Sequence, residues 1–258
     1  MIPPLLPLLL LGAFAAAQQP GSGQPGGAQP EDGLRLHVEL AAGSGRFEFT
    51  TDGSPSRTGH TDAGYLGLTL ELIGEHDVGG GVRVEGIRTD DDLFLDTGGI
   101  RSRGTDNDVF LFGTGLFGDG VETRVPLRLG LLARNLVHKD LTSDVSTEWQ
   151  AVGLGFEIEP DFALAHEGPV RWSLYSRFGV AFALATVSTD PATFDADSKM
   201  RSVDVGVGTR LQFGAGELGV GWLYRAVTFD ESAAVNGARF AAVDARFSGL
   251  FATFALRF

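Results

Sequence analysis

The sequence predicts an all-β fold: a closed, antiparallel, up-and-down β-barrel that crosses a membrane with about ten strands, with eight or twelve as alternatives. Three observations support this prediction. Segments that alternate apolar and polar residues recur along the chain, the connections between them alternate between short and long, and the last segment is itself an amphipathic strand. Because side chains alternate across a strand, each such segment has one apolar face that can meet lipid.

The composition favours strands over helices and excludes several functions. The 258 residues include 37 Gly and 19 Phe, and no Cys that could form a disulfide or a thiolate site. A mean hydropathy of +0.07 is low for a bundle of membrane helices, yet it fits a barrel with one apolar and one polar face. The net charge of −13 argues against nucleic acid as a partner, because nucleic-acid binding needs a basic surface.

The amino-terminal residues predict secretion. Residues 1–17 form an apolar segment that ends in three Ala residues before Gln18, as in a signal peptide with a small-residue cleavage site. A buried apolar segment is the alternative. Residues 18–33 are rich in Pro, Gly and Gln and are expected to be a flexible linker. The barrel domain is therefore expected to occupy residues 34–258.

Ten strands are expected in this domain. The first three alternate Leu or Val with charged residues and Gly, whereas the fourth is apolar on both faces. The fifth and sixth alternate Leu, Val and Phe with Arg, Glu and Gly, and the next three oppose apolar residues to Arg, Tyr, Gly and Ala. The tenth changes phase near Ser248–Gly249, which predicts a β-bulge there. The expected ranges are about 34–51, 66–72, 82–85, 109–117, 124–131, 152–158, 171–184, 203–213, 218–225 and 240–258.

The expected connections separate the two ends of the barrel. Short connections are expected near 75–80, 118–122 and 214–216, long ones near 43–63, 89–108, 135–148 and 188–199, and a medium one near 230–237. The segment 159–169 lies on the short side and is expected to hold a brief helical turn. Short turns at one end, long loops at the other and an even number of strands are typical of outer-membrane barrels. A soluble sandwich or lipocalin-like barrel is the alternative.

The last nine residues, 250–258, read L-F-A-T-F-A-L-R-F. This strand is expected to pair with the strand that starts at Leu34 and to turn its even-numbered face to lipid. It resembles the carboxy-terminal signal of bacterial outer-membrane barrels, although position 256 is Leu where an aromatic residue is common. The resemblance implies an assembly signal at Phe258, Leu256 and Phe254. It also implies barrel-insertion machinery, periplasmic chaperones and outer-membrane lipid as partners, in the envelope of a Gram-negative bacterium.

The polar faces of the strands are expected to point into the barrel. Mixed charges in a narrow interior favour Arg–carboxylate pairing, because an unpaired charge there is costly. A salt-bridged structural core and a narrow water-filled pore both remain open, and Gly and Ala on the inner faces favour a pore by leaving free volume. The candidate lumen charges are Arg83, Glu71, Arg128, Arg177, Asp204, Arg210 and Arg225, with Arg35, Glu39, Glu85, Arg124 and Glu157 also expected to point inward.

No catalytic, cofactor or metal site is predicted. The five histidines occur in no His-x-Ser pair, and the sequence contains no G-x-S-x-G nucleophile elbow. His37 is interpreted as a structural residue beside Glu39. The acidic residues at 90–92, 106 and 108 are expected in an outer loop and lack the spacing of a calcium-binding loop.

Residues 149–258 carry four motifs, which share a pattern of alternation more than fixed residues. G-L-G-F-E at 153–157 is followed by R-W-S-L-Y-S-R-F-G at 171–179, by V-D-V-G-V-G-T-R at 203–210 and by a closing A-L-R-F. In this pattern of alternating apolar and polar residues, the segment resembles the pore-forming outer-membrane barrels grouped with the Legionella major outer-membrane protein. The resemblance implies a pore for small solutes. The alternatives are a non-conducting structural or adhesion barrel acting through long acidic loops and, third, an outer-membrane hydrolase.

Overall fold

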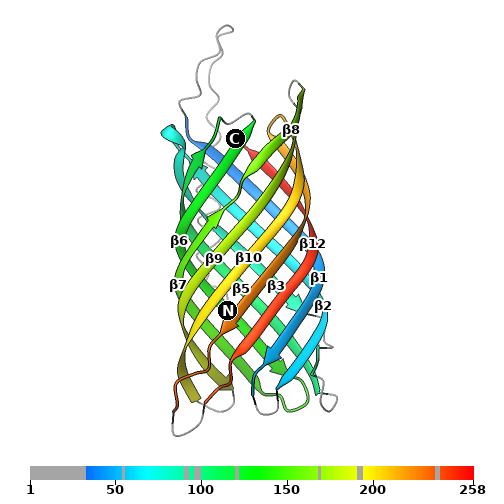
Figure 1. Ribbon diagram of the computed structural model, residues 1–258, viewed down its shortest axis with the longest axis vertical. Coiled ribbons are helices and arrows are strands. Elements are labelled where there is room, and N and C mark those ends of the chain that lie inside the picture. Colours follow the sequence, from blue (N-terminus) through cyan, green and yellow to red (C-terminus); the bar gives the residue numbers. More distant parts are fainter. Residues whose placement is uncertain are drawn as a thin grey trace.

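The computed structural model describes residues 33–53, 56–89, 93–95, 100–119, 122–167, 170–190, 194–235 and 239–258, which form one tall β-barrel (Figure 1). The predicted signal peptide at 1–17 and the linker up to residue 32 lie outside the described residues. No helix among the described residues is long and apolar enough to cross a membrane.

The barrel is built from twelve antiparallel strand segments and one 3₁₀ turn. Neighbouring segments are hydrogen-bonded, and the ring closes because β1 pairs with both β2 and β12. The segments are β1 (Arg35–Thr51), β2 (Arg57–Ile73), η1 (Glu75–Asp77), β3 (Val78–Thr89), β4 (Leu93–Leu95), β5 (Ile100–Phe117), β6 (Thr123–Asp140), β7 (Ser146–Ile158), β8 (Asp161–Glu167), β9 (Val170–Asp190), β10 (Phe194–Phe213), β11 (Gly216–Phe229) and β12 (Val243–Arg257).

The twelve segments make ten barrel strands, because two of the strands are interrupted. β4 continues β3, since both pair with β2 on one side and β5 on the other. β8 continues β7 between β6 and β9 in the same register, from Ile158 opposite Phe178 to Asp161 opposite Tyr175. The break falls at Pro160, which has no N–H to donate to a neighbouring strand. The prediction of a ten-stranded closed barrel is therefore confirmed, whereas within 159–169 the described residues Asp161–Glu167 form β8 in place of the expected helical turn.

The strands are longer than the sequence predicted, and the long loops are correspondingly shorter. β1 ends at Thr51 and β2 begins at Arg57, while β6 ends at Asp140 and β7 begins at Ser146. β9 has 21 residues and β10 has 20, about twice the 9–11 residues that cross a bilayer. The segments expected as long loops at 43–63, 89–108, 135–148 and 188–199 are therefore mostly strand. We call this end of the barrel the loop end, and the end with the short turns and Phe258 the turn end.

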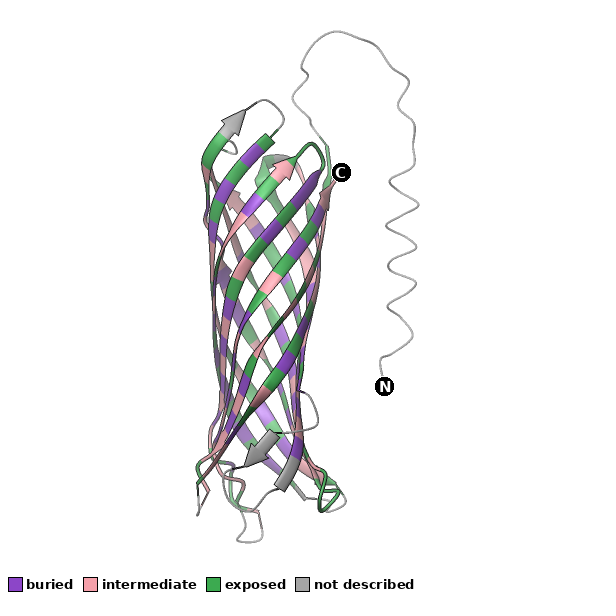
Figure 2. Cartoon of the chain, turned by 90° about the vertical axis from the view of Figure 1, so that its right-hand side faces the viewer, coloured by how far each residue is buried: buried purple, intermediate pink, exposed green. Residues whose placement is uncertain are grey.

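The outer surface changes character along the barrel axis. Near the turn end the outward side chains are large and apolar, and this apolar belt includes Leu66, Val152, Leu184, Val220 and Leu250, all at least 58% exposed. Toward the loop end the outward positions of the same strands become polar, and they include Arg46, Asp62, Gln150, Arg201 and Arg246. We call this polar section of the barrel wall the polar extension. Figure 2 shows the alternation of buried and exposed residues continuing along both sections.

The interior changes in the opposite sense. Inside the apolar belt it is charged, whereas inside the polar extension it is filled by apolar side chains. Phe49, Trp149 and Phe229 come from β1, β7 and β11, and we call these three residues the aromatic plug. The Trp149 ring centroid lies 6.0 Å from that of Phe49 and 6.1 Å from that of Phe229, and all three side chains are buried. The polar extension is therefore packed like a soluble barrel, with its apolar residues inside.

This inversion explains the phase change near Ser248–Gly249. β12 keeps one register against β1 from His37–Arg257 to Thr51–Val243, and it keeps one register against β11 as well, so the predicted bulge is wrong. Phe254 points outward in the apolar belt, whereas Phe247 points into the barrel and is 2% exposed. The apolar residues therefore change from the outer to the inner face of β12 while the backbone stays regular.

The apolar belt has the height of a bilayer core. The eight residue steps from Leu250 to Phe258 rise ~3.3 Å each and, at a tilt of ~40°, span about 20 Å, near the ~25 Å of known barrels. Aromatic residues mark its edges. Trp172 lies outward near the turn end, and the ring of Trp222 stacks on that of Tyr224 at 6.1 Å near the opposite edge. Such girdles are found where membrane barrels meet the lipid headgroups.

The three tryptophans of the chain test the placement of the belt. In variants that keep one Trp and replace the others by Phe, lipids with brominated acyl chains should quench the fluorescence of Trp172 and Trp222. Trp149 is 4% exposed inside the polar extension and should be unaffected. Equal quenching of all three would contradict the assignment of the belt.

Candidate functional site

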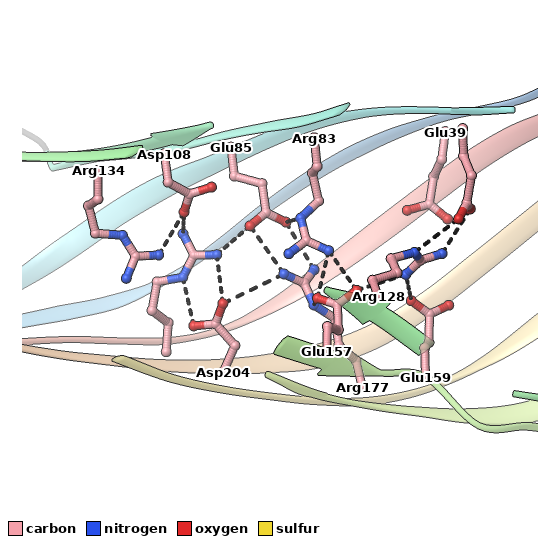
Figure 3. A network of polar contacts seen from close by, with 12 residues as sticks. Glu39, Arg83, Glu85, Asp108, Arg128, Arg134, Glu157, Glu159, Arg177 and Asp204 are labelled. Atoms are coloured by element: carbon pink, nitrogen blue, oxygen red, sulfur yellow. Dashed lines mark hydrogen bonds and ion pairs between the residues drawn. The ribbon is translucent and has the colours of Figure 1, made fainter. Parts of the chain in front are cut away.

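The charged interior of the apolar belt is the candidate site. Arginines and carboxylates follow one another along the barrel axis from Arg134 to Glu39 (Figure 3), and we call this chain of contacts the ion-pair ladder. The structure places all seven candidate lumen charges in it, whereas Arg35, which was also expected to point inward, pairs with Asp77 and its side chain is 45% exposed. The exposed fractions are 8% for Arg83, 2% for Glu71, 5% for Arg128, 8% for Asp204, 8% for Arg210 and 1% for Arg225, and the side chain of Arg177 is 12% exposed.

In the part of the ladder nearest the loop end, the contacts converge on Arg225 of β11. Its Nη1 lies 2.7 Å from Asp108 Oδ2, and its Nε donates to Asp204 Oδ1 at 3.0 Å. Its Nη2 also donates to Glu85, which belongs to β3 on another part of the wall. Arg134 Nη2 adds a second donor to Asp108 Oδ2 at 2.7 Å. One guanidinium thus joins carboxylates from three strands.

Two arginines occupy the middle of the ladder. Arg177 of β9 donates from Nη1 to Glu85 Oε1 at 2.9 Å, and its Nε lies 2.8 Å from Glu157 Oε2. Arg83 of β3 reaches the same carboxylate, with Nη1 2.7 Å from Glu157 Oε2. These contacts join β3 to β7 and β9, which are not its neighbours in the sheet. The ladder therefore crosses the lumen as well as lining it.

The turn-end part of the ladder is built around Arg128 and Arg210. Arg128 donates to Glu71 through Nε and Nη2 at 3.2 and 3.0 Å, which is a bidentate contact. Its Nη1 lies 2.7 Å from Glu157 Oε1 and 3.1 Å from Glu159 Oε2. Arg210 Nη1 meets the other oxygen of Glu159 at 2.6 Å. Glu159 therefore links the two arginines.

The glycines of the inner face do not leave an open lumen. A Cβ on Gly155 would lie 2.9 Å from the ring of Phe110, and one on Gly208 would lie 2.7 Å from the ring of Tyr175. The guanidinium of Arg210 in turn lies 3.8 Å from the centroid of the Tyr175 ring. The space left by the missing side chains is thus filled by aromatic rings. A cavity of about 20 Å³ beside Arg83 and Asp204 has room for about one water molecule.

Sequence reasoning missed part of the ladder. Asp106 and Asp108 were expected in an outer loop, but they lie on β5, 1% and 2% exposed, and face the barrel interior. Arg134 was not singled out at all, and it pairs with both of them. The sequence does carry the alternation of a strand here, because the two aspartates are two residues apart and alternate with the outward Thr105 and Asn107. This alternation is hard to recognise because the outward residues are polar too.

The predicted assembly residues lie on β12 where the barrel closes. Phe258 and Phe254 point outward, 61% and 43% exposed, and Leu256 is half-buried. Backbone hydrogen bonds of 2.9 Å run both ways between Leu36 and Phe258, and the register pairs Val38 with Leu256. The predicted pairing of this strand with the one starting near Leu34 is confirmed. The role of these residues in assembly stays a prediction.

One group of side chains has the composition of a metal site. His37, Glu39 and Glu217 each bring a potential ligand atom within 4.8 Å of the others at the turn end. Both carboxylates face Arg210, which lies 3.6 Å from Glu39 Oε2 and 3.3 Å from Glu217 Oε1. Arg257 approaches Glu217 Oε2 to 2.6 Å. Because arginine already neutralises these carboxylates, we assign the group to the ladder.

Comparisons with known proteins show the fold. No protein-family model matches the sequence, and no curated protein matches it either. The outer-membrane protease OmpT from Escherichia coli superposes with a TM-score of 0.51 at 10% sequence identity, covering 88% of this chain and 97% of OmpT. The toluene transporter TodX from Pseudomonas putida gives 0.33 at 11% identity, covering 88% and 90%, and Ail from Yersinia pestis gives 0.28 at 13%, covering 85% and 98%. The chain therefore shares the closed-barrel fold of OmpT.

Removing Arg225 tests the importance of the ladder. Arg225→Met removes the one guanidinium that contacts Glu85, Asp108 and Asp204 together. We expect the free energy of unfolding in detergent to fall by about 3–5 kcal/mol. Arg246→Met, at an arginine whose side chain is 51% exposed, should change stability by no more than about 0.5 kcal/mol.

Urea unfolding of both variants, followed by heat-modifiable gel migration, measures the difference. Arg225→Lys keeps the charge but loses the planar fork, so it should fall between wild type and Arg225→Met. Equal stability of the Arg225→Met and Arg246→Met proteins would contradict a bracing role for the ladder.

Proposed function

We propose that the chain is an integral outer-membrane protein whose barrel is closed to solutes and carries its polar extension on the cell surface. The apolar belt supports insertion into a bilayer, because only closed barrels and helices satisfy all backbone groups in hydrocarbon. The long connection between Phe229 of β11 and Val243 of β12 lies at the loop end, and the polar extension continues the strands beyond the belt on that side. Both features support an orientation with the loop end outside the cell. In this proposal the insertion machinery and periplasmic chaperones act on β12 before the ring closes, with Phe258 in the recognised segment.

The filled interior is the observation that carries the proposal of a closed barrel. In the described residues, the ion-pair ladder crosses the lumen within the belt, and the aromatic plug fills it within the polar extension. Water or ions would have to displace both layers in order to pass. Breaking a buried ion pair leaves a costly unpaired charge, so spontaneous opening is disfavoured. With the interior filled, a binding function would have to use the outer surface of the barrel.

A narrow pore for small solutes is the competing hypothesis. The resemblance of residues 149–258 to the Legionella major outer-membrane protein family supports it, and the aromatic rings that fill the space beside Gly155 and Gly208 oppose it. A hydrolase is the third hypothesis. Among the described histidines, His138 stacks on Phe49 at 4.7 Å, and His37 Nδ1 lies 3.8 Å from Glu71 Oε2. Neither contact supplies a nucleophile.

Planar-bilayer recordings decide between the closed barrel and the pore. The purified full chain, inserted at neutral pH, should give no discrete conductance steps, while a porin in the same bilayer serves as the positive control. Stepwise currents that scale with the amount of inserted protein would overturn the closed-barrel proposal and favour the pore.

The absence of cysteine makes the orientation testable on intact cells. Ser143 lies in the exposed connection between β6 and β7 at the loop end. The cysteine of a Ser143→Cys variant should therefore react with a membrane-impermeant maleimide. Ala215→Cys lies exposed in the turn between β10 and β11, and it should react only after the outer membrane is permeabilised. The reverse pattern would place the polar extension in the periplasm.

A further inference from the structure

A hollow on the outside of the barrel lies where the apolar belt meets the polar extension. Its volume is about 520 Å³, and β7, β9 and β10 form its floor. Two rows of outward side chains cross these strands in register. One row contains Val152, Leu184 and Lys199, and the other contains Leu154, Phe182 and Arg201. Each row is thus apolar on two strands and cationic on the third.

The apolar side chains of the hollow are highly exposed. Val152, Leu154, Phe182 and Leu184 are 64%, 61%, 64% and 75% exposed. They form the last apolar rows of the belt, because the next row toward the loop end contains Gln150, Thr186 and Asp197. Within the proposed membrane orientation, their height is that of the upper acyl chains of the outer leaflet.

The cationic part of the hollow lies on β10. Arg201 is held by Asp230, with Nη2 2.8 Å from Oδ1. Lys199 is exposed and makes no side-chain ion pair with the described carboxylates. The two basic residues and Asp230 leave a net charge of +1 beside the apolar rows. An occupant that complements this pattern has an anionic head directly attached to apolar chains.

We propose that this hollow binds an acyl lipid with a phosphorylated headgroup from the outer leaflet, with the phosphate at Lys199 and Arg201 and the chains on β7 and β9. The proposal rests on the membrane orientation proposed above. A lipid fits better than a free anion, because a free anion would contact only the cations on β10 and leave the apolar side chains on β7 and β9 without a partner. The attraction of lysine and arginine for anionic headgroups supplies the selectivity, while the apolar rows supply contact that any acyl lipid can make.

Binding of defined lipids tests the site directly. Native mass spectrometry of the detergent-solubilised full chain should show dioleoyl phosphatidate bound about tenfold more tightly than dioleoyl phosphatidylcholine. The double variant Lys199→Gln, Arg201→Gln should lose this preference and bind both lipids alike. Leu184→Ser should weaken the binding of both lipids while keeping the preference for phosphatidate.

The matched control is Arg246→Gln. Arg246 is also outward and half-exposed, but its neighbours across the strands are Glu48 and Ala226 instead of an apolar wall, so the preference should persist. A preference that survives in the Lys199→Gln, Arg201→Gln protein would overturn the proposal, and so would competition by inorganic phosphate as strong as that by phosphatidate. Flotation of each variant with lipid vesicles separates the two proposals: failure of wild type to insert would refute the membrane assignment and not the lipid site alone.

Discussion

The cost of an unpaired charge in a closed interior is the constraint on which the rest of this structure depends. An inward arginine cannot reach bulk water through the barrel wall, so its charge must be met inside. Arg225 meets Glu85, Asp108 and Asp204, and these carboxylates are shared with further arginines along the axis. Because each of these contacts joins different strands, the same ion pairs that neutralise the buried charges also hold the barrel wall together. A filled lumen follows directly from it.

A second constraint is that one continuous wall has two sections of opposite polarity. In the apolar belt, apolar side chains lie outside and charged ones inside, whereas in the polar extension, polar side chains lie outside and the aromatic plug inside. β12 crosses this boundary without changing register, turning Phe254 out and Phe247 in. Regular strands can serve both sections because a pleated strand offers two faces everywhere, and only the side chains have to exchange.

The apolar belt is the part of the fold that the sequence predicted most closely. Ten strands, antiparallel closure and the inward direction of the charges follow from its clean alternation of apolar and polar residues, as at Leu66–Leu72. The polar extension was hidden, since polar outward residues next to Asp106 and Asp108 look like a loop. The pairing partners could not be predicted, because Arg83 meets Glu157 across 74 residues and through the lumen. Glycine was ambiguous for a related reason: Gly208 makes room for Tyr175, which lies on another strand.

A closed interior moves the question of function to the outer surface. The residue composition of most of that surface fits the proposed surroundings, because uniformly apolar residues suit lipid and mixed polar residues suit water. The hollow between β7 and β10 is different, since Leu184 and Lys199 are direct neighbours there and require two environments within one contact distance. An amphiphile provides both at once, and the boundary between belt and extension is where the headgroups of a bilayer would lie in the proposed orientation. The site therefore follows from the same inversion that gives the barrel its two sections.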